Sequence, residues 1–166
     1  MHIIFSHGKE SGPWGSKIRR LAAEAESAGH TVESLDYTDT LDPDQRVEQL
    51  LSHCENSAAP DLLVGSSMGG YVSLVAAEKL QPRGLFLMAP ALFMPGYSRQ
   101  SYLFSGNTSI VHGWNDEVIP FDNSVSFARS KLAALHLVNS DHGLASALDD
   151  VAALFAAYCA SVESGS

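Results

Sequence analysis

The stretch PDLLVGSSMGGYVSLVAA, residues 60–77, decides the fold. Residues 60–64 form a continuous apolar strand, and residues 70–77 continue as a helix. Between them, Gly65-Ser66-Ser67-Met68-Gly69 matches GxSxG, the pattern of a sharp strand-to-helix turn that exposes a nucleophilic serine. Glycine is needed on both sides because a side chain there would crowd the turn. The stretch therefore predicts Ser67 as a nucleophile at the end of a buried strand.

Short apolar or β-branched runs alternate with helical periodicity along the rest of the chain, which is typical of βαβ units. The predicted strands are residues 3–6, 31–36, 62–65, 84–89, 109–112 and 135–139. The predicted helices are residues 14–28, 43–57, 68–80, 121–132 and 144–161. We expect an α/β fold, a three-layer sandwich around a mostly parallel sheet of about six strands.

Length and composition indicate one globular domain. The chain has 166 residues, 45% hydrophobic and 17% charged, which suits a single core over residues 1–161 with a flexible polar tail at 162–166. A net charge of −9 argues against nucleic acid and anionic membranes as partners. Two cysteines, Cys54 and Cys159, make no disulfide framework and are expected to be reduced.

The N-terminus starts directly with a strand and lacks the pattern of an export signal. No apolar run reaches the roughly 18–20 residues that cross a bilayer. We therefore expect a cytoplasmic protein with no membrane partner.

A serine hydroxyl needs a base to take its proton and a third group to orient that base. Asp116 follows the strand at 109–112, and His142 follows the strand at 135–139. Since the carboxyl ends of parallel strands meet at one edge of the sheet, we expect Ser67, Asp116 and His142 to converge there.

Other residues compete for these roles. Asp141 is adjacent to His142 and should point away from its ring, while Glu117 should face solvent and Asp122 could cap a helix. His7 and His112 each precede a glycine after a strand, and a loop-stiffening role suits them better than catalysis. No pair among the 7 histidines has a spacing suited to a metal, so no metal is predicted.

Two backbone N–H groups are expected to bind the oxyanion of the reaction. One belongs to Met68, the residue after the nucleophile, and the other to Lys9, in the loop after the first strand. A plain strand-to-helix turn is the alternative for residues 7–13. Residues 7–13 are not predicted to bind phosphate, because the spacing of Gly8, Gly12 and Gly15 matches neither GxGxxG nor GxxxxGK[ST].

The segment 90–108 fits neither a helix nor a strand and is longer than most connections, which favours a functional loop. Its apolar side chains either line a substrate pocket or pack under their own loop. They are Leu92, Phe93, Met94, Tyr97, Tyr102 and Phe104.

Taken together, His7-Gly8, the GxSxG turn, His112-Gly113 through Asp116 to Pro120, and Asp141-His142-Gly143 resemble the α/β-hydrolase superfamily over nearly the whole chain. The resemblance is to small, single-domain, lidless serine esterases, although the chain opens at the oxyanion strand without the two strands that usually precede it. It implies a minimal α/β-hydrolase fold, no cofactor, a shallow site, and hydrolysis of small carboxylic esters. Acyl thioester hydrolysis and a non-catalytic partner-binding role remain the alternatives.

Overall fold

The computed structural model describes residues 1–165 and has the predicted α/β architecture. Six strands form one sheet in the order β2-β1-β3-β4-β5-β6, and every neighbouring pair is parallel. The strands are β1 (His2–Ser6), β2 (Thr31–Leu35), β3 (Leu62–Ser66), β4 (Gly84–Met88), β5 (Thr108–Gly113) and β6 (Ala134–Val138). The helices are α1 (Ser16–Ser27), α2 (Pro43–Glu55), α3 (Met68–Leu80), α4 (Phe121–Lys131) and α5 (Leu148–Ser164), with a 3₁₀ turn at Ala145–Ala147.

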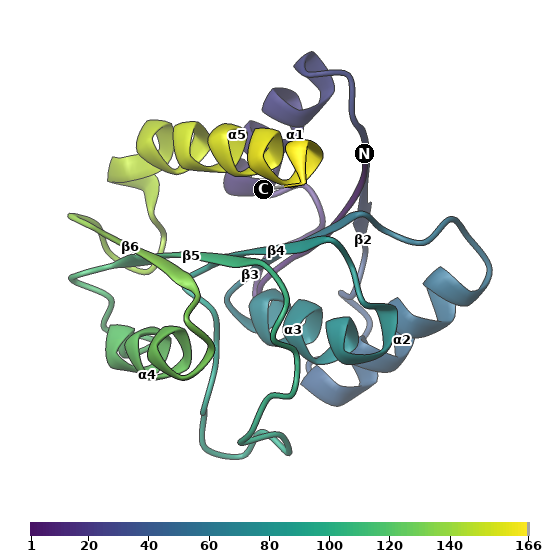
Figure 1. Cartoon of the computed structure of the whole chain (residues 1–166). Coiled ribbons are helices and arrows are strands. Elements are labelled where there is room, and N and C mark those ends of the chain that lie inside the picture. The colour runs from purple at the N-terminus through teal and green to yellow at the C-terminus, as the bar shows by residue number, and fades with distance from the viewer. Residues whose placement is uncertain (166) are drawn as a thin grey trace.

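Helices cover both faces of the sheet, α1 and α5 on one side and α2, α3 and α4 on the other (Figure 1). Alternate residues of each central strand enter opposite cores. In β4, Leu85 and Leu87 join the core under α2, α3 and α4, whereas Phe86 and Met88 join the core under α1 and α5. Because both faces are covered, the central strands read as unbroken apolar runs in the sequence.

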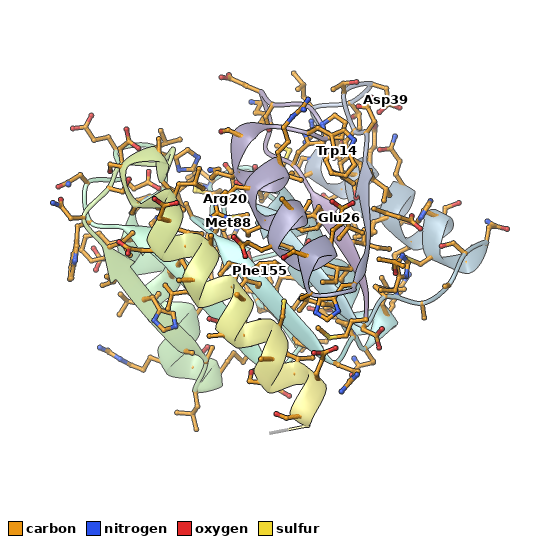
Figure 2. The ribbon with its side chains drawn as sticks, turned by 90° about the horizontal axis from the view of Figure 1, so that it is seen from above. Trp14, Arg20, Glu26, Asp39, Met88 and Phe155 are labelled. Carbon is orange, nitrogen blue, oxygen red and sulfur yellow. The ribbon has the colours of Figure 1, made fainter. Side chains whose placement is uncertain are left out.

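The helix α5 lies across the face seen in Figure 2 and contributes Phe155 to the core. The Phe155 ring contacts Phe86 at a centroid distance of 5.2 Å and Phe5 at 6.2 Å. The segment Ala145–Ser164 is long and apolar enough to span a membrane by length and composition. Its apolar side chains pack on the sheet and on α1, and the core helix of a globular domain passes the same test.

The C-terminal tail was predicted to begin too early. Helix α5 continues to Ser164, and Val162 is buried in the core, so residues 162–164 belong to the domain. The apolar residue at 162 extends the helical stripe of Phe155 and Cys159 by one more turn. Residue 166 of the predicted tail lies outside the described residues.

The strand order reverses between β1 and β3. The chain runs from β1 outward to β2 and returns to pair β3 on the other side of β1, with Ser6 beside Gly65 in the register. The connections that leave β1 and β3 therefore diverge to opposite faces, the arrangement at which ligands of open α/β sheets commonly bind. The loops that carry Lys9 and Ser67 begin at this point.

Candidate active site

Ser67 occupies the turn between β3 and α3 with an unusual backbone conformation, φ 54° and ψ −119°. The turn is tight because α3 starts immediately beside β1. A Cβ on Gly69 would lie 2.0 Å from the carbonyl oxygen of Ser6, so only glycine fits. The side chain of Ser67 stays accessible to solvent while its neighbours Ser66 and Met68 are buried.

Ser67, His142 and Asp116 form one hydrogen-bonded chain. His142 Nε2 lies 3.0 Å from Ser67 Oγ, and His142 Nδ1 lies 2.7 Å from Asp116 Oδ2. A carboxylate can only accept, so Nδ1 carries the proton and Nε2 is left to accept the proton of the Ser67 hydroxyl. The three residues come from loops after β3, β5 and β6, as the sequence predicts.

Asp116 is fully buried at its side chain and is surrounded by donors. Oδ1 accepts from the N–H groups of Val118 at 2.9 Å and Ile119 at 2.8 Å, while Oδ2 accepts from His142 and from His112 Nε2 at 3.0 Å. Burial alone would raise the pKa of Asp116, but the hydrogen bonds from Ile119, His142 and Val118 outweigh it and hold the pKa below its ordinary value. The carboxylate is therefore kept ionised and aimed at His142.

His112 is a buried partner of Asp116 that the sequence reasoning assigned only to loop stiffening. Its Nε2 faces two acceptors, Asp116 Oδ2 at 3.0 Å and the carbonyl of Ile119 at 3.1 Å, so Nε2 carries the proton. Its Nδ1 then accepts from the hydroxyl of Ser124 at 2.8 Å. Burial lowers the pKa of His112, which keeps the ring neutral in this arrangement.

The competing acids lie elsewhere. Asp141 Oδ1 accepts from the N–H of Gly143 at 2.9 Å within its own loop, and Glu117 is exposed. Asp122 lies in the first turn of α4, where Pro120 is the N-cap. Of these four acids, all within residues 1–165, Asp116 alone forms a hydrogen bond with the His142 ring.

Lys17 of α1 also contacts the loop that carries His142. The sequence analysis did not predict this contact. Its Nζ donates to the carbonyl of His142 at 3.4 Å. Burial lowers the pKa of Lys17, while the charges of Asp116 and Asp141 oppose that shift. This contact links α1 to the loop that carries His142.

Both predicted oxyanion donors flank the serine. Met68 is the first residue of α3, where a backbone N–H has no intrahelical acceptor. Gly8 packs against Ser67, since a Cβ on Gly8 would lie 3.5 Å from Ser67 Cβ, and Lys9 is the next residue. The two predicted donors therefore belong to the two segments that meet at Ser67.

The predicted pocket residues divide into two groups. Leu92, Tyr102 and Phe104 are buried in the core cluster beneath their own loop. Phe93, Met94 and Tyr97 are partly exposed and pack against that core or at its edge. Only the second group remains available to contact a ligand.

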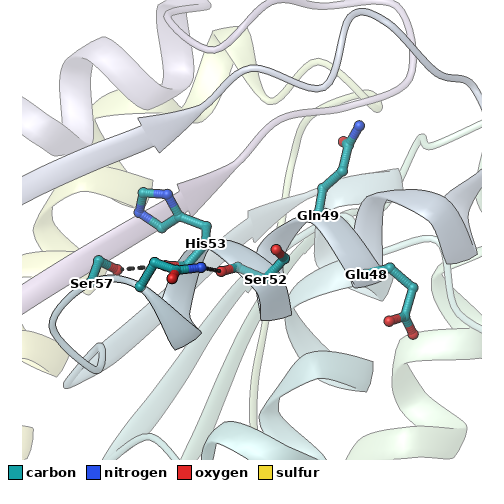
Figure 3. A pocket seen from close by; sticks show the side chains of 6 residues that line it. Glu48, Gln49, Ser52, His53 and Ser57 are labelled. Carbon is teal, nitrogen blue, oxygen red and sulfur yellow. Dashed lines mark hydrogen bonds between the residues drawn. The ribbon is translucent and has the colours of Figure 1, made fainter.

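The hollow drawn in Figure 3 lies along the outer side of α2 and shares no residue with the Ser67 site. Its lining residues are Glu48, Gln49, Ser52, His53, Asn56 and Ser57. Within residues 1–165, no group of three or more His, Cys, Asp or Glu side chains is placed to hold a metal ion.

Comparisons with known proteins match the fold. The model of an uncharacterised protein family, UPF0227, matches residues 2–103. A solved structure from Xanthomonas campestris pv. campestris, assigned to the alpha/beta hydrolase superfamily, is 32% identical, with a TM-score of 0.88 over 96% of this chain and 98% of that chain. A search of curated proteins gave no match.

Two more distant structures share the fold. Est1E from Butyrivibrio proteoclasticus is 18% identical, with a TM-score of 0.86 over 98% of this chain and 88% of that chain. An α/β serine hydrolase without a lid, from Xanthomonas campestris, is 18% identical, with a TM-score of 0.67 over 94% of this chain and 80% of that chain.

Proposed function

Because this chain belongs to the α/β-hydrolase superfamily and to the protein family UPF0227, we propose that it is a serine hydrolase that cleaves small carboxylic esters. The observation that carries the proposal is the hydrogen-bonded chain from Ser67 through His142 to Asp116, with distances of 3.0 and 2.7 Å. A serine, a histidine and a buried carboxylate in this order are the components of acyl transfer.

In the proposed acylation step, Ser67 Oγ attacks the ester carbonyl while His142 Nε2 takes the hydroxyl proton. Negative charge then develops on the carbonyl oxygen, where the N–H groups of Lys9 and Met68 would stabilise it. Asp116 stabilises the imidazolium that forms. His142 returns the proton to the leaving alcohol, which leaves an acyl group on Ser67.

Deacylation repeats these steps with water as the nucleophile. His142 takes a proton from water, the oxyanion forms again at the same N–H groups, and Ser67 departs with its proton restored. Every proton in the cycle is carried by His142, so the proposal requires no cofactor.

Labelling with a fluorophosphonate tests the nucleophile directly. We expect stoichiometric modification of the wild-type protein at neutral pH and none of Ser67→Ala, with matching loss of nitrophenyl butyrate hydrolysis. Ser66→Ala is the matched control, because Ser66 is the buried neighbour on β3 and takes no part in the hydrogen-bonded chain. A wild-type protein that is folded yet neither labelled nor active would favour a partner-binding role on a hydrolase scaffold.

Acyl-chain length is the next property to test. The wall available near the loop after β4 consists of the partly exposed Phe93, Met94 and Tyr97, which is too little chain for a closed tunnel. Each buried methylene adds about 0.8 kcal/mol only while it finds apolar contact. We therefore expect kcat/KM for nitrophenyl esters to peak at about two to six carbons and to fall by palmitate.

The measurement compares acetate, butyrate, octanoate and palmitate esters with the matching acyl thioesters. Phe93→Ala should weaken butyrate and octanoate hydrolysis more than acetate hydrolysis, whereas Leu132→Ala, at an exposed site on the end of α4, should change none of them. A steady rise of kcat/KM out to the palmitate ester would contradict the short-acyl prediction. A higher kcat/KM for the thioesters than for the esters would indicate that acyl thioesters are the substrate class.

A further inference from the structure

Arg46 is a buried cation that forms no direct ion pair with a carboxylate of residues 1–165. It projects from α2 into the core, and its relative exposure is 0%. Burying a charge is costly unless polar groups compensate it. The direct hydrogen bonds to the Arg46 guanidinium all come from backbone carbonyls, and the centroid of the Tyr37 ring lies 5.6 Å from the guanidinium carbon.

Three consecutive carbonyls of the loop after β1 face the Arg46 guanidinium. Nη1 lies 3.1 Å from the oxygen of Gly8 and 3.4 Å from that of His7, and Nη2 lies 3.4 Å from that of Lys9. Nε donates to the carbonyl of Thr40 at 2.9 Å. The planar guanidinium, whose N–H donors have fixed directions, therefore binds the three successive carbonyls of residues 7–9.

The direction of these carbonyls fixes the direction of the adjoining N–H groups. In a planar trans peptide, the C=O and the following N–H point to opposite sides. With the Gly8 oxygen held on Arg46, the N–H of Lys9 must face the opposite side of the loop. Throughout the described chain this N–H has no protein acceptor, and Gly8 itself packs against Ser67.

His7 holds the same peptide from a second direction. Its Nε2 accepts from the N–H of Tyr37 at 2.9 Å, so the proton lies on Nδ1, which donates to the Gly8 oxygen at 2.8 Å. Burial lowers the pKa of His7 and keeps this tautomer neutral. The Gly8 carbonyl thus accepts from two buried side chains.

We propose that Arg46 is a positioning residue that orients the Gly8–Lys9 peptide so that the Lys9 N–H faces the oxyanion at Ser67. This inference rests on the proposed function, since it assumes that Ser67 is the nucleophile. Without the guanidinium, the Gly8 carbonyl keeps the hydrogen bond from His7 but loses the one from Arg46, so the Gly8–Lys9 peptide is held less firmly and the Lys9 N–H is less well aimed. Misalignment of the Lys9 N–H should raise the free energy of the transition state and leave that of the bound ester unchanged, because the oxyanion forms only in the transition state.

The test replaces Arg46 by methionine, which fills similar space without donors, and by lysine, which keeps the charge without the fork. With nitrophenyl butyrate we expect kcat to fall by about 100-fold in Arg46→Met and by at least about tenfold in Arg46→Lys. KM should stay within about threefold, because substrate binding does not use the oxyanion. Affinity for an alkyl boronic acid, which forms a tetrahedral adduct on serine, should fall in parallel with kcat.

Tyr158→Phe is the matched control for lost stability. The Tyr158 hydroxyl makes two buried backbone contacts, to Leu85 N and Asn107 O, on the opposite face of the sheet. We expect this variant to lower the melting temperature and to leave kcat unchanged. If Arg46→Met does not fold, Arg46→Lys and His7→Gln carry the same test.

The two proposals fail in different ways. Wild-type protein that is not labelled by fluorophosphonate overturns the proposed function. The role of Arg46 alone is overturned if the wild-type protein is active and folded Arg46→Met keeps its kcat and its boronate affinity within about threefold of wild type. If Arg46→Met does not fold, the same result from folded Arg46→Lys and folded His7→Gln overturns it.

Discussion

Asp116 accepts hydrogen bonds from Val118, Ile119, His112 and His142, so its orientation is fixed on every side. Replacing it with asparagine keeps the size but removes the charge and allows an amide to face the ring, which favours the wrong tautomer of His142. We expect Asp116→Asn to lower kcat by about 10³- to 10⁴-fold. Steady-state hydrolysis of nitrophenyl butyrate, with circular dichroism to confirm folding, measures the effect.

Asp141→Asn is the paired control, since Asp141 is adjacent to the base but only accepts from Gly143 N–H. An asparagine side-chain oxygen can accept the same bond, so we expect kcat within about threefold of wild type. A larger loss from Asp141→Asn than from Asp116→Asn would mean that the base is oriented from its own loop.

At the scale of elements, the turn between β3 and α3 depends on how closely α3 approaches β1. The Cβ introduced by Gly69→Ala would lie 2.0 Å from the Ser6 carbonyl, so either the helix or the strand must move. We expect a loss of about 3 kcal/mol in the free energy of unfolding and a larger relative loss of activity, because Ser67 moves with the helix. Urea denaturation and kcat/KM give the two values.

Gly12→Ala is the control for a glycine-to-alanine change in a neighbouring loop. No atom lies within 4 Å of the added Cβ, and the residue does not have a positive φ. We expect a change of no more than about 0.5 kcal/mol and normal activity. Equal effects of the two substitutions would argue that the close approach at Gly69 is not what shapes the turn.

The elements themselves could be predicted from the sequence because each has a local signal. Helix α3 has the predicted bounds, and the other elements differ by a few residues at their ends. The helix predicted from residue 14 begins at Ser16, because Gly15 is its N-cap in an extended conformation. The helix predicted from 144 begins at Leu148, because Leu144 adopts φ 56° and a 3₁₀ turn intervenes.

The members of the hydrogen-bonded chain also had local signals, a GxSxG turn and polar residues after strands. Arg46 and Lys17 could not be assigned in this way, because their partners are carbonyls brought close only by packing of α2 and α1. One signal for Arg46 was present: it adjoins Val47 and shares the buried face of α2 with Leu50. The apolar loop residues were ambiguous, since a core contact and a pocket wall require the same side chains.

At the scale of the whole molecule, His7 and His112 are buried in neutral forms with pKa values lowered from 6.5 by desolvation. Below pH 6.5 the unfolded chain binds protons at these residues while the folded chain does not, so stability decreases as the pH falls. Each histidine contributes at most about 1.4 kcal/mol per pH unit in that window. Above pH 6.5 their contribution is constant.

Urea denaturation between pH 7.5 and pH 5.5 measures this dependence. We expect His112→Gln to flatten the slope relative to wild type, even though the variant is less stable at pH 7.5. His136→Gln, at a partly exposed site on β6, should leave the slope as it is. A wild-type stability that is level down to pH 5.5 would contradict the prediction.

The order of the strands also determines when Ser67 and His142 can come together during synthesis. Ser67 and His142 are 75 residues apart in the sequence, and β6, which delivers His142, is both the last strand and an edge of the sheet. A ribosome releases the chain from its N-terminus, so the serine emerges long before its base. Until β6 pairs with β5, Ser67 is an ordinary alcohol. The proposed activity can therefore arise only after the last strand has joined the sheet.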